Sequence, residues 1–130
     1  MIEQPEGMVG GLSNCGVVAI ASALGLKYSV VWDAVKKAGK KSARWRGTMH
    51  TSEIQRTVKK LGGKIKAVKK GGTLTKWIEW EGAGGATYII HTGNHYVAVR
   101  DQQVVDQHSA SPIGEHKCRK QRVKVAWKIN

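Results

Sequence analysis

One cysteine stands where a thiol can act as a nucleophile. Residues 1–13 form a Gly-rich lead-in, and from Cys15 onward apolar residues recur at helical spacing, so we expect a helix that begins at Cys15. The free N–H groups and partial positive charge of a helix N-terminus favour a thiolate and can donate to an oxyanion. A thiolate in that place would attack a carbonyl carbon. The alternative is that Cys15 is a small buried apolar side chain without chemistry.

A thiolate nucleophile works with a base and with an acceptor that orients the base. His95 opens a predicted strand, and Asp106 closes the strand that returns after a turn. Because side chains alternate along a strand, a turn at either Asp101-Gln102 or Gln102-Gln103 puts His95 and Asp106 on one face. Straight strands would leave them about 7–13 Å apart, so twist or a bulge must close the remainder. We predict His95 as the base and Asp106 as its orienter; the alternative is a surface histidine and a turn aspartate.

The second cysteine and the remaining histidines are weaker candidates. Cys118 lies between Lys117 and Arg119, away from any predicted helix start, and we expect it to take no part in the chemistry. The other histidines are expected on the surface: His50, His91, His108 and His116.

Metal ligation is not expected from the cysteine spacing. Neither Cys15 nor Cys118 has Cys or His neighbours that complete a four-ligand zinc set, and the basic neighbours of Cys118 repel a cation. We therefore expect no metal and no cofactor. Two cysteines this far apart leave an oxidised pair open but form no disulfide framework, so a reducing compartment is favoured.

The elements that must position these residues change character half-way along the chain. Helical periodicity runs from Cys15 to a stop at Gly25, resumes after the N-cap candidate Ser29, and resumes again after Thr51 or Ser52. Later segments are predicted as a brief helix at 73–80 and as short strands at 65–67, 87–91, 95–100, 104–106 and 123–129. Helices followed by antiparallel strands predict an α+β fold, a single domain over residues 1–130 with N-terminal helices packed on a small sheet.

The last predicted strand has the clearest pattern. Its apolar residues alternate with basic or small ones: Val123, Val125, Trp127 and Ile129. This alternation predicts one buried face and one basic, solvent-exposed face.

Charge is the unusual feature of the composition. The chain has 22 Lys and Arg against 9 Asp and Glu, a formal net charge of +13, concentrated in residues 36–46, 59–70 and 117–128. Such a field attracts polyanions, and it indicates either a solvated basic surface or non-specific contact with DNA or RNA, because no nucleic-acid-binding motif accompanies it. No apolar run reaches the roughly 20 residues of a membrane span, and the acidic, proline-containing N-terminus is not typical of a signal peptide, so no membrane contact is expected.

The segment from Asn14 to Ala21, with the Gly25-Leu26 turn after it, resembles the nucleophile helix of the papain-like cysteine peptidases. In particular, the chain resembles small phage and bacterial proteins similar to the bacteriocin-processing, or double-glycine, peptidases. The resemblance continues in order through residues 28–39, 46–48, 61–62, 73–77, 85–90, 95–101 and 104–106. It implies hydrolysis of a peptide or isopeptide bond through an acyl-enzyme, with Cys15, His95 and Asp106 as the triad.

The sequence departs from the family pattern at the oxyanion donor. Papain-like enzymes usually carry a glutamine about six residues before the cysteine, and this chain has Val9 there. Gln4 would serve only if the Gly-rich lead-in folds back, and Asn14 or a glycine N–H is the other candidate. Loss of one such donor costs roughly 10²–10³ in rate.

These features together predict a cysteine peptidase-like hydrolase, encoded by a phage or a bacterium. It would act on a peptide or protein substrate in the host cytoplasm or in a virion. One alternative is a catalytically weak papain-like module that serves as a basic structural, virion or nucleic-acid-associated protein. Another is a nucleic-acid-binding protein in which the Cys, His and Asp residues coincide by chance.

Overall fold

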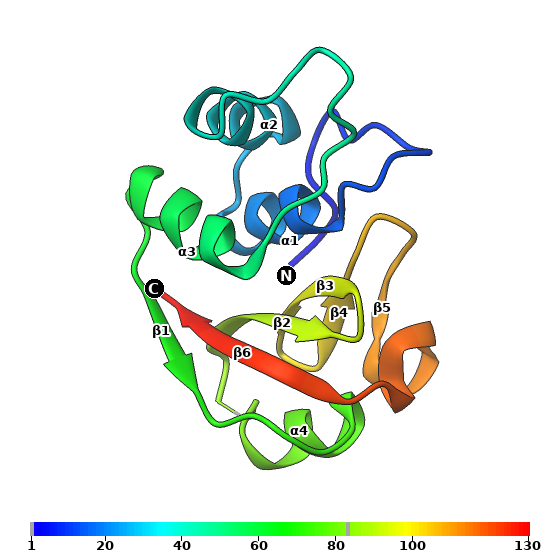
Figure 1. The fold of residues 1–130 in the computed structure, drawn as a ribbon. Coiled ribbons are helices and arrows are strands. Elements are labelled where there is room, and N and C mark those ends of the chain that lie inside the picture. The colour runs from blue at the N-terminus through cyan, green and yellow to red at the C-terminus, as the bar shows by residue number, and fades with distance from the viewer. Residues whose placement is uncertain (1, 83) are drawn as a thin grey trace.

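A computed structural model of the chain describes residues 2–82 and 84–130 (Figure 1). Within these residues, α-helices dominate the first half and a six-stranded antiparallel sheet the second, which confirms the predicted α+β class. The helices are α1 (Cys15–Leu24), α2 (Tyr28–Ala38), α3 (Thr51–Lys60), α4 (Leu74–Trp80) and the short 3-10 helices η1 (Ile113–Glu115) and η2 (Lys117–Lys120). The strands are β1 (Ile65–Val68), β2 (Thr87–Thr92), β3 (His95–Arg100), β4 (Gln103–Val105), β5 (Ala110–Pro112) and β6 (Val123–Ile129). None of the helices in the described ranges has the length and apolar character that a membrane crossing requires.

Helix α1 is the central element of the N-terminal layer. It lies between the sheet and the other two large helices, α2 and α3 (Figure 1), and all of its residues from Gly16 to Ser22 are buried. An apolar helix that is buried on every side is typical of a core position. The helix ends as predicted at Gly25, which adopts a left-handed conformation with φ of 67°.

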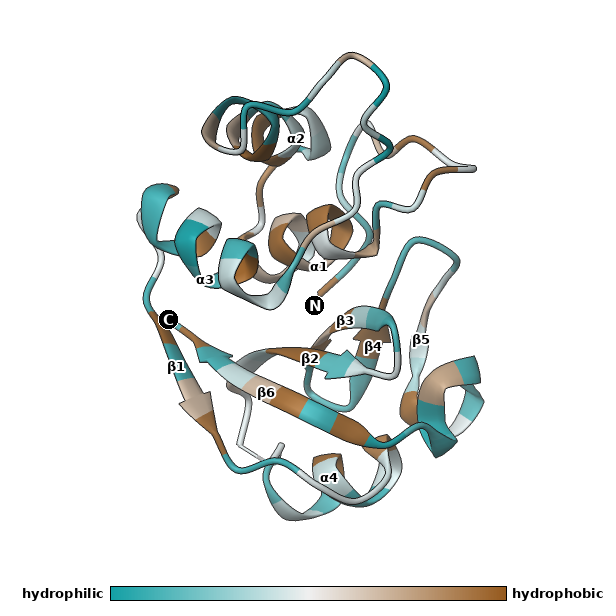
Figure 2. Ribbon diagram, in the orientation of Figure 1, coloured by the Kyte–Doolittle hydropathy of each residue, from teal (hydrophilic) through white to brown (hydrophobic). Residues whose placement is uncertain are grey.

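Both faces of the sheet are covered. The strand order is β1-β6-β2-β3-β4-β5. Ile89, Tyr96 and Trp127 face the N-terminal helices, whereas Ile90 and Val97 face α4 on the opposite side. Figure 2 shows the apolar residues of the helices and strands concentrated where these layers meet. The sheet is therefore a middle layer, and its strands carry apolar residues on both sides.

Strand β6 departs from the predicted alternation because it contains a β-bulge. Val125 pairs with His91 and Val123 pairs with Thr92, so Lys124 has no partner of its own. One extra residue reverses which face the following side chains take. Val123 consequently packs on the α4 side, although Trp127 packs on the N-terminal helices. The prediction of a basic solvent face holds only in part for this strand: Lys124 is exposed, but Ala126 is buried against α4.

Two local details also differ from the sequence expectations. Ser29 lies inside α2, which already begins at Tyr28, because the Tyr28 backbone N–H donates to the Glu6 carbonyl and ties the lead-in to the helix start. The segment from Ala110 to Lys120, for which no element was predicted, forms β5 and the two 3-10 helices.

The β3–β4 hairpin sets the register of the predicted base and orienter. Its two turn residues, Asp101 and Gln102, have φ of 50° and 64°, the combination typical of a two-residue type I′ turn. Ala98 then pairs with Val105, so the next residue, Asp106, comes opposite Val97. Of the two registers left open by the sequence, the structure has the one with the turn at Asp101-Gln102.

Gly47 lets the loop before α3 approach the start of α1. It has φ of 102°, and a Cβ atom there would lie 2.8 Å from Asn14 Cβ and 3.1 Å from Trp32 Cζ3. Neither the backbone conformation nor the space admits a side chain. Gly47 therefore helps to hold the residue that precedes Cys15.

We expect Gly47→Ala to lower the free energy of unfolding by about 2–4 kcal/mol, because it combines backbone strain with overpacking against Asn14. Urea unfolding followed by circular dichroism measures this. Gly10→Ala is the matched control, since Gly10 has nothing within 4 Å of its Cβ position. Equal stabilities of the two variants would contradict the argument.

Candidate active site

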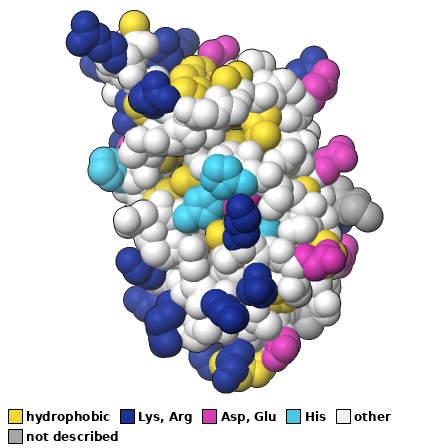
Figure 3. All heavy atoms as spheres, turned by 90° about the vertical axis from the view of Figure 1, so that its right-hand side faces the viewer, with side chains coloured by type: hydrophobic (Ala, Val, Ile, Leu, Met, Phe, Trp, Pro, Cys, Tyr) yellow, Lys and Arg dark blue, Asp and Glu magenta, His cyan; other side chains and the backbone are white. Residues whose placement is uncertain are grey.

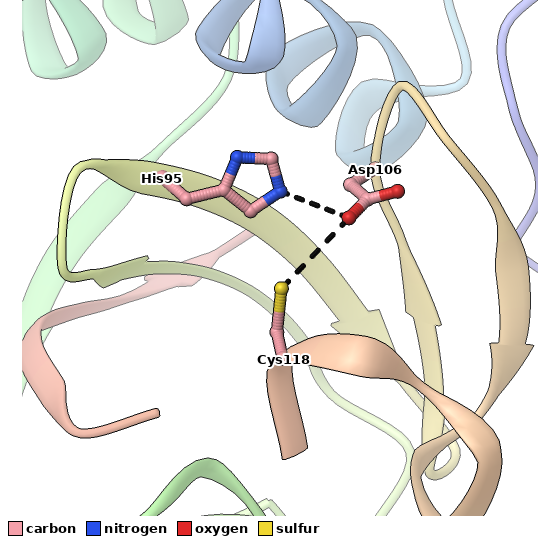
Figure 4. Close-up of side chains that lie close together, drawn as sticks. All are labelled: His95, Asp106 and Cys118. Carbon is pink, nitrogen blue, oxygen red and sulfur yellow. Dashed lines mark hydrogen bonds and ion pairs between the residues drawn. The ribbon is translucent and has the colours of Figure 1, made fainter. Parts of the chain in front are cut away.

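The predicted base and orienter are in contact. His95 Nε2 lies 2.9 Å from Asp106 Oδ2 (Figure 4). His95 is the first residue of β3, and Asp106 follows the last residue of β4. Since Asp106 comes opposite Val97, the two residues are diagonal neighbours, which long side chains can bridge on a twisted hairpin.

Cys15 is the first residue of α1, as predicted, and is partly exposed. Its side chain lies close enough to His95 to act on the imidazole by hydrogen bonding and by charge. Figure 4 shows the second ring nitrogen of His95 directed away from Asp106, toward the N-terminal helices. The structure thus brings Cys15, His95 and Asp106 together in that order.

The N-terminus of α1 retains its hydrogen-bond donors. The first hydrogen bond into the helix runs from the Val18 N–H to the Asn14 carbonyl, and no side chain in the described part of the chain caps the helix. The N–H groups of Cys15, Gly16 and Val17 therefore have no acceptor within the helix. Such groups beside a thiol can stabilise the negative oxygen formed when the thiolate attacks a carbonyl.

The His95–Asp106 pair is strongly polarised toward the charged form. Burial lowers the pKa of His95, but hydrogen bonds to Asp106, Cys118 and Cys15 and the charge of Cys15 outweigh it and raise the pKa to about 11. Burial raises the pKa of Asp106, but its interactions with His116 and His95 and two backbone N–H groups outweigh it and hold the pKa well below its ordinary value. An imidazolium held on a carboxylate is the state that a thiolate–imidazolium pair requires.

The second oxygen of Asp106 is fixed by the backbone. The N–H groups of His108 and Ser109 donate to Asp106 Oδ1 at 2.8 and 2.9 Å. The carboxylate is almost fully buried, at 2% exposure. Its orientation is therefore set by the loop that follows β4, and Oδ2 is left to face the side chains around it.

Two residues that were not expected at the site also meet Asp106. His116 Nε2 lies 3.3 Å and Cys118 Sγ lies 3.9 Å from Asp106 Oδ2. The prediction of His116 as a surface residue is wrong, since it is 1% exposed. Both residues reach the site through η1 and η2, which no periodic pattern in the sequence predicts. A ligand atom from each of His95, Asp106 and Cys118 lies within 4.8 Å of the others, which makes these residues a candidate metal-ligand set among those described.

Cys118 is a polar thiol rather than an inert apolar residue. Burial raises its pKa, but hydrogen bonds to His116 and His95 and the positive charge of both rings outweigh it and lower the pKa to about 7. Its side chain is buried, at 5% exposure.

The remaining histidines have other surroundings. His50 and His108 are exposed, although the His108 ring stacks on His95 with centroids 6.3 Å apart. His91 is half-buried and stacks on Tyr96 at 4.6 Å.

The two candidate oxyanion side chains are engaged elsewhere. Asn14 is fully buried, and its amide nitrogen donates to the Val9 carbonyl at 2.9 Å and to the Tyr28 hydroxyl at 2.8 Å. The lead-in does fold back, and Gln4 Nε2 donates to the backbone carbonyl of Asp106 at 2.9 Å. Both amide hydrogens of Asn14 are thus used by the protein, whereas Gln4 uses one of its two.

The Asp106 side of His95 borders a surface hollow, of which Cys15 is not a lining residue. The hollow has a volume of about 240 Å³ and is lined by His95, Asp106, His108, Ser109, Lys117, Cys118 and Gln121. Figure 3 shows histidine side chains gathered near the middle of this face, with Lys and Arg side chains around and below them. Solvent and small solutes can therefore reach the side of His95 that faces Asp106.

Comparisons with known proteins identify the fold. No family model and no curated protein matches the sequence. Among solved structures, the peptidase domain of Streptococcus ComA, a bi-functional ABC transporter involved in a quorum-sensing pathway, superposes with a TM-score of 0.62 and 14% identity, over 99% of this chain and 98% of that one. A double-glycine-motif protease from an AMS/PCAT transporter, solved with the leader peptide, superposes with a TM-score of 0.59 and 16% identity, over 97% of this chain and 90% of that one. The chain therefore has the papain-like fold of double-glycine peptidase domains, as its resemblance predicted.

The pKa of Asp106 generates a prediction about acid stability. A carboxylate whose pKa is lower in the folded than in the unfolded state stabilises the fold above its unfolded pKa near 4, and this contribution is lost as the pH falls. Between about pH 5 and pH 2, we expect the free energy of unfolding to fall less in Asp106→Asn than in the wild type, by more than about 1.4 kcal/mol.

Urea unfolding at a series of pH values measures this difference. Asp33→Asn, at an exposed position of α2, is the control and should follow the wild-type profile. Parallel profiles for the wild type and Asp106→Asn would mean that Asp106 carries no stabilising charge.

Proposed function

We propose that this protein is a cysteine peptidase with Cys15 as nucleophile, His95 as base and Asp106 as the residue that orients His95. The observation that carries the proposal is the contact of one imidazole with both partners: it bonds Asp106 at 2.9 Å and interacts with the thiol at the start of α1. The same fold in two peptidase domains supports the reaction class.

The reaction follows from the roles of these side chains. The Cys15 thiolate attacks the carbonyl carbon of the scissile bond, and the oxyanion that forms lies at the N-terminus of α1. His95 then gives its proton to the leaving amine, which departs and leaves a thioester on Cys15. Water attacks the thioester with His95 as base, and the acid product and the free thiolate are restored. Asp106 keeps the ring orientation and stabilises its positive charge throughout.

The proposed substrate is a peptide or the exposed segment of a protein. One fold neighbour is described as a double-glycine-motif protease in complex with the leader peptide, so peptides that contain a double-glycine motif are the first substrates to test. Isopeptide bonds are the second class. We propose an origin in a phage or a bacterium, with action in the host cytoplasm or in a virion.

We expect Cys15→Ser and His95→Ala each to lower the turnover of such a peptide by more than about 10³, because nucleophile and base act as one unit. Cys118→Ser should retain turnover, since Cys118 lies on the other side of His95 from the first helix. Cleavage is followed by mass spectrometry of the peptide fragments.

If no cleavage is seen, alkylation with iodoacetamide distinguishes an unsuitable substrate from an unreactive Cys15. Cys15 should be labelled more slowly in His95→Ala than in the wild type, whether or not a substrate has been found. Cleavage that persists in Cys15→Ser, or labelling of Cys15 that is independent of His95, would rule out the proposed triad.

A catalytically weak module with a basic surface is the second candidate. It is favoured by the amide groups of the two candidate oxyanion donors. Both amide hydrogens of Asn14 bond Val9 and Tyr28, and one of the two of Gln4 bonds the Asp106 carbonyl. It is favoured also by the net charge of +13. Such a protein would retain a reactive thiol but turn over slowly, and it would associate with DNA or RNA through charge alone.

We expect any binding to DNA to be non-specific and to weaken by about 10³ or more between 50 and 200 mM salt, as counterion release requires for several phosphate contacts. Fluorescence anisotropy of labelled duplexes with two unrelated sequences measures it. Cys15→Ala should bind like the wild type. Binding that resists salt, or that prefers one sequence strongly, would show a specific site instead.

A further inference from the structure

The side of His95 that faces away from Cys15 has a ligand geometry of its own. His95 Nε2 lies 2.9 Å and Cys118 Sγ lies 3.9 Å from the same atom, Asp106 Oδ2. Ligand atoms of a tetrahedral zinc ion, bound at about 2.0–2.3 Å, lie about 3.3–3.6 Å apart. These two separations lie on either side of this range, and all three ligand atoms lie within 4.8 Å of one another. Side-chain rotations would therefore place nitrogen, oxygen and sulfur around one ion.

We propose that His95, Asp106 and Cys118 form a binding site for a zinc ion, and that the ion inactivates the nucleophile's base. Three protein atoms would coordinate the ion: His95 Nε2, Asp106 Oδ2 and the Cys118 thiolate sulfur. The proton on His95 Nε2 and the thiol proton of Cys118 leave to solvent, and no oxidation state changes. Imidazole, carboxylate and thiolate are all ligands that zinc accepts, and a solvent molecule in the hollow can complete four-coordination.

His116 fixes the carboxylate of this ligand set. It is 1% exposed, and its Nε2 lies 3.3 Å from Asp106 Oδ2. Its Nδ1 accepts from the Cys118 backbone N–H at 3.1 Å, so the ring proton of the neutral form lies on Nε2, which faces Asp106. His116 therefore cannot be a fourth ligand in this tautomer. It is placed to donate to the carboxylate that binds the ion, an arrangement common around metal sites.

The remaining surroundings of the ligands are also compatible with zinc. Asp106 Oδ1 is held by the N–H groups of His108 and Ser109, which leaves Oδ2 for the metal. Lys117 lines the same hollow and repels a cation, as does the net charge of the protein. Carboxylate and thiolate together carry two negative charges, which neutralise a divalent ion, so the repulsion weakens binding without abolishing it.

Zinc binding and the proposed catalysis exclude each other. An imidazole bound through Nε2 carries its remaining proton on Nδ1, and it cannot accept another from Cys15. Its bond to Asp106 is lost as well. This consequence rests on the proposed function, but the binding itself does not, because Cys15 is not a ligand of the site.

The test compares two single-thiol variants, Cys15→Ala and Cys118→Ala, with cobalt(II) as a spectroscopic substitute for zinc. We expect a thiolate-to-cobalt charge-transfer band in the wild type and in Cys15→Ala, and its absence in Cys118→Ala. Titration with zinc alone should give one ion per chain, bound more than about 100-fold more weakly by Cys118→Ala. Circular dichroism verifies that each variant is folded, and Cys118→Ser serves in place of Cys118→Ala if the smaller side chain disturbs the core.

A band that is lost in Cys15→Ala and kept in Cys118→Ala would overturn the proposal, since the ion would then lie between Cys15 and His95. Loss of the band in both variants, or no binding of cobalt or zinc by the wild type, would also overturn the proposal. None of these outcomes depends on peptide cleavage, which is assayed separately on metal-free protein. A protein that is inactive without metal but binds cobalt through Cys118 contradicts the peptidase and supports the metal site, and a protein that is active without metal but never shows the band does the reverse.

Discussion

The buried carboxylate of Asp106 is the interaction on which the candidate site depends. A charge at 2% exposure is costly unless it is surrounded by donors, and here the donors come from separate parts of the chain. His95 comes from β3, two backbone N–H groups come from the loop after β4, and His116 and Cys118 come from the C-terminal 3-10 helices. The need to satisfy one carboxylate thus ties the hairpin and the C-terminal segment together, and it orients the imidazole beside Cys15.

The layers of the fold explain why the imidazole can reach Cys15 at all. His95 has the parity of Val97, which faces α4, whereas α1 lies on the opposite face of the sheet. His95 is the first residue of β3, so no strand residue precedes it to enclose its ring. The ring can therefore contact Cys15 of α1 as well as side chains on the α4 side of the sheet. The same position leaves it between two thiols, Cys15 and Cys118. The residue that serves as base in the proposed peptidase is therefore also accessible to a competing ligand set.

Much of this arrangement was predictable because it depends on local rules. Apolar spacing and the stop at Gly25 predict α1 and place Cys15 at its first position. Alternation along β3 and β4 puts His95 and Asp106 on one face for either turn, and the structure has the turn at Asp101-Gln102. The bulge in β6 was not predictable, since an extra residue in one strand is defined only by its pairing with β2. The burial of Ala126 likewise depends on α4, which covers the second face of the sheet.

The sequence by itself determined the class of fold, the start of the first helix and the common face of His95 and Asp106, because periodicity and parity are properties of neighbouring residues. Only the tertiary structure decided that Asn14 and Gln4 use their amides within the protein, and that His116 and Cys118 lie against Asp106. These contacts join residues whose separation along the chain carries no periodic signal. They are selected by the desolvated carboxylate, which takes its donors from whichever segments the packing of the sheet and helices brings to it.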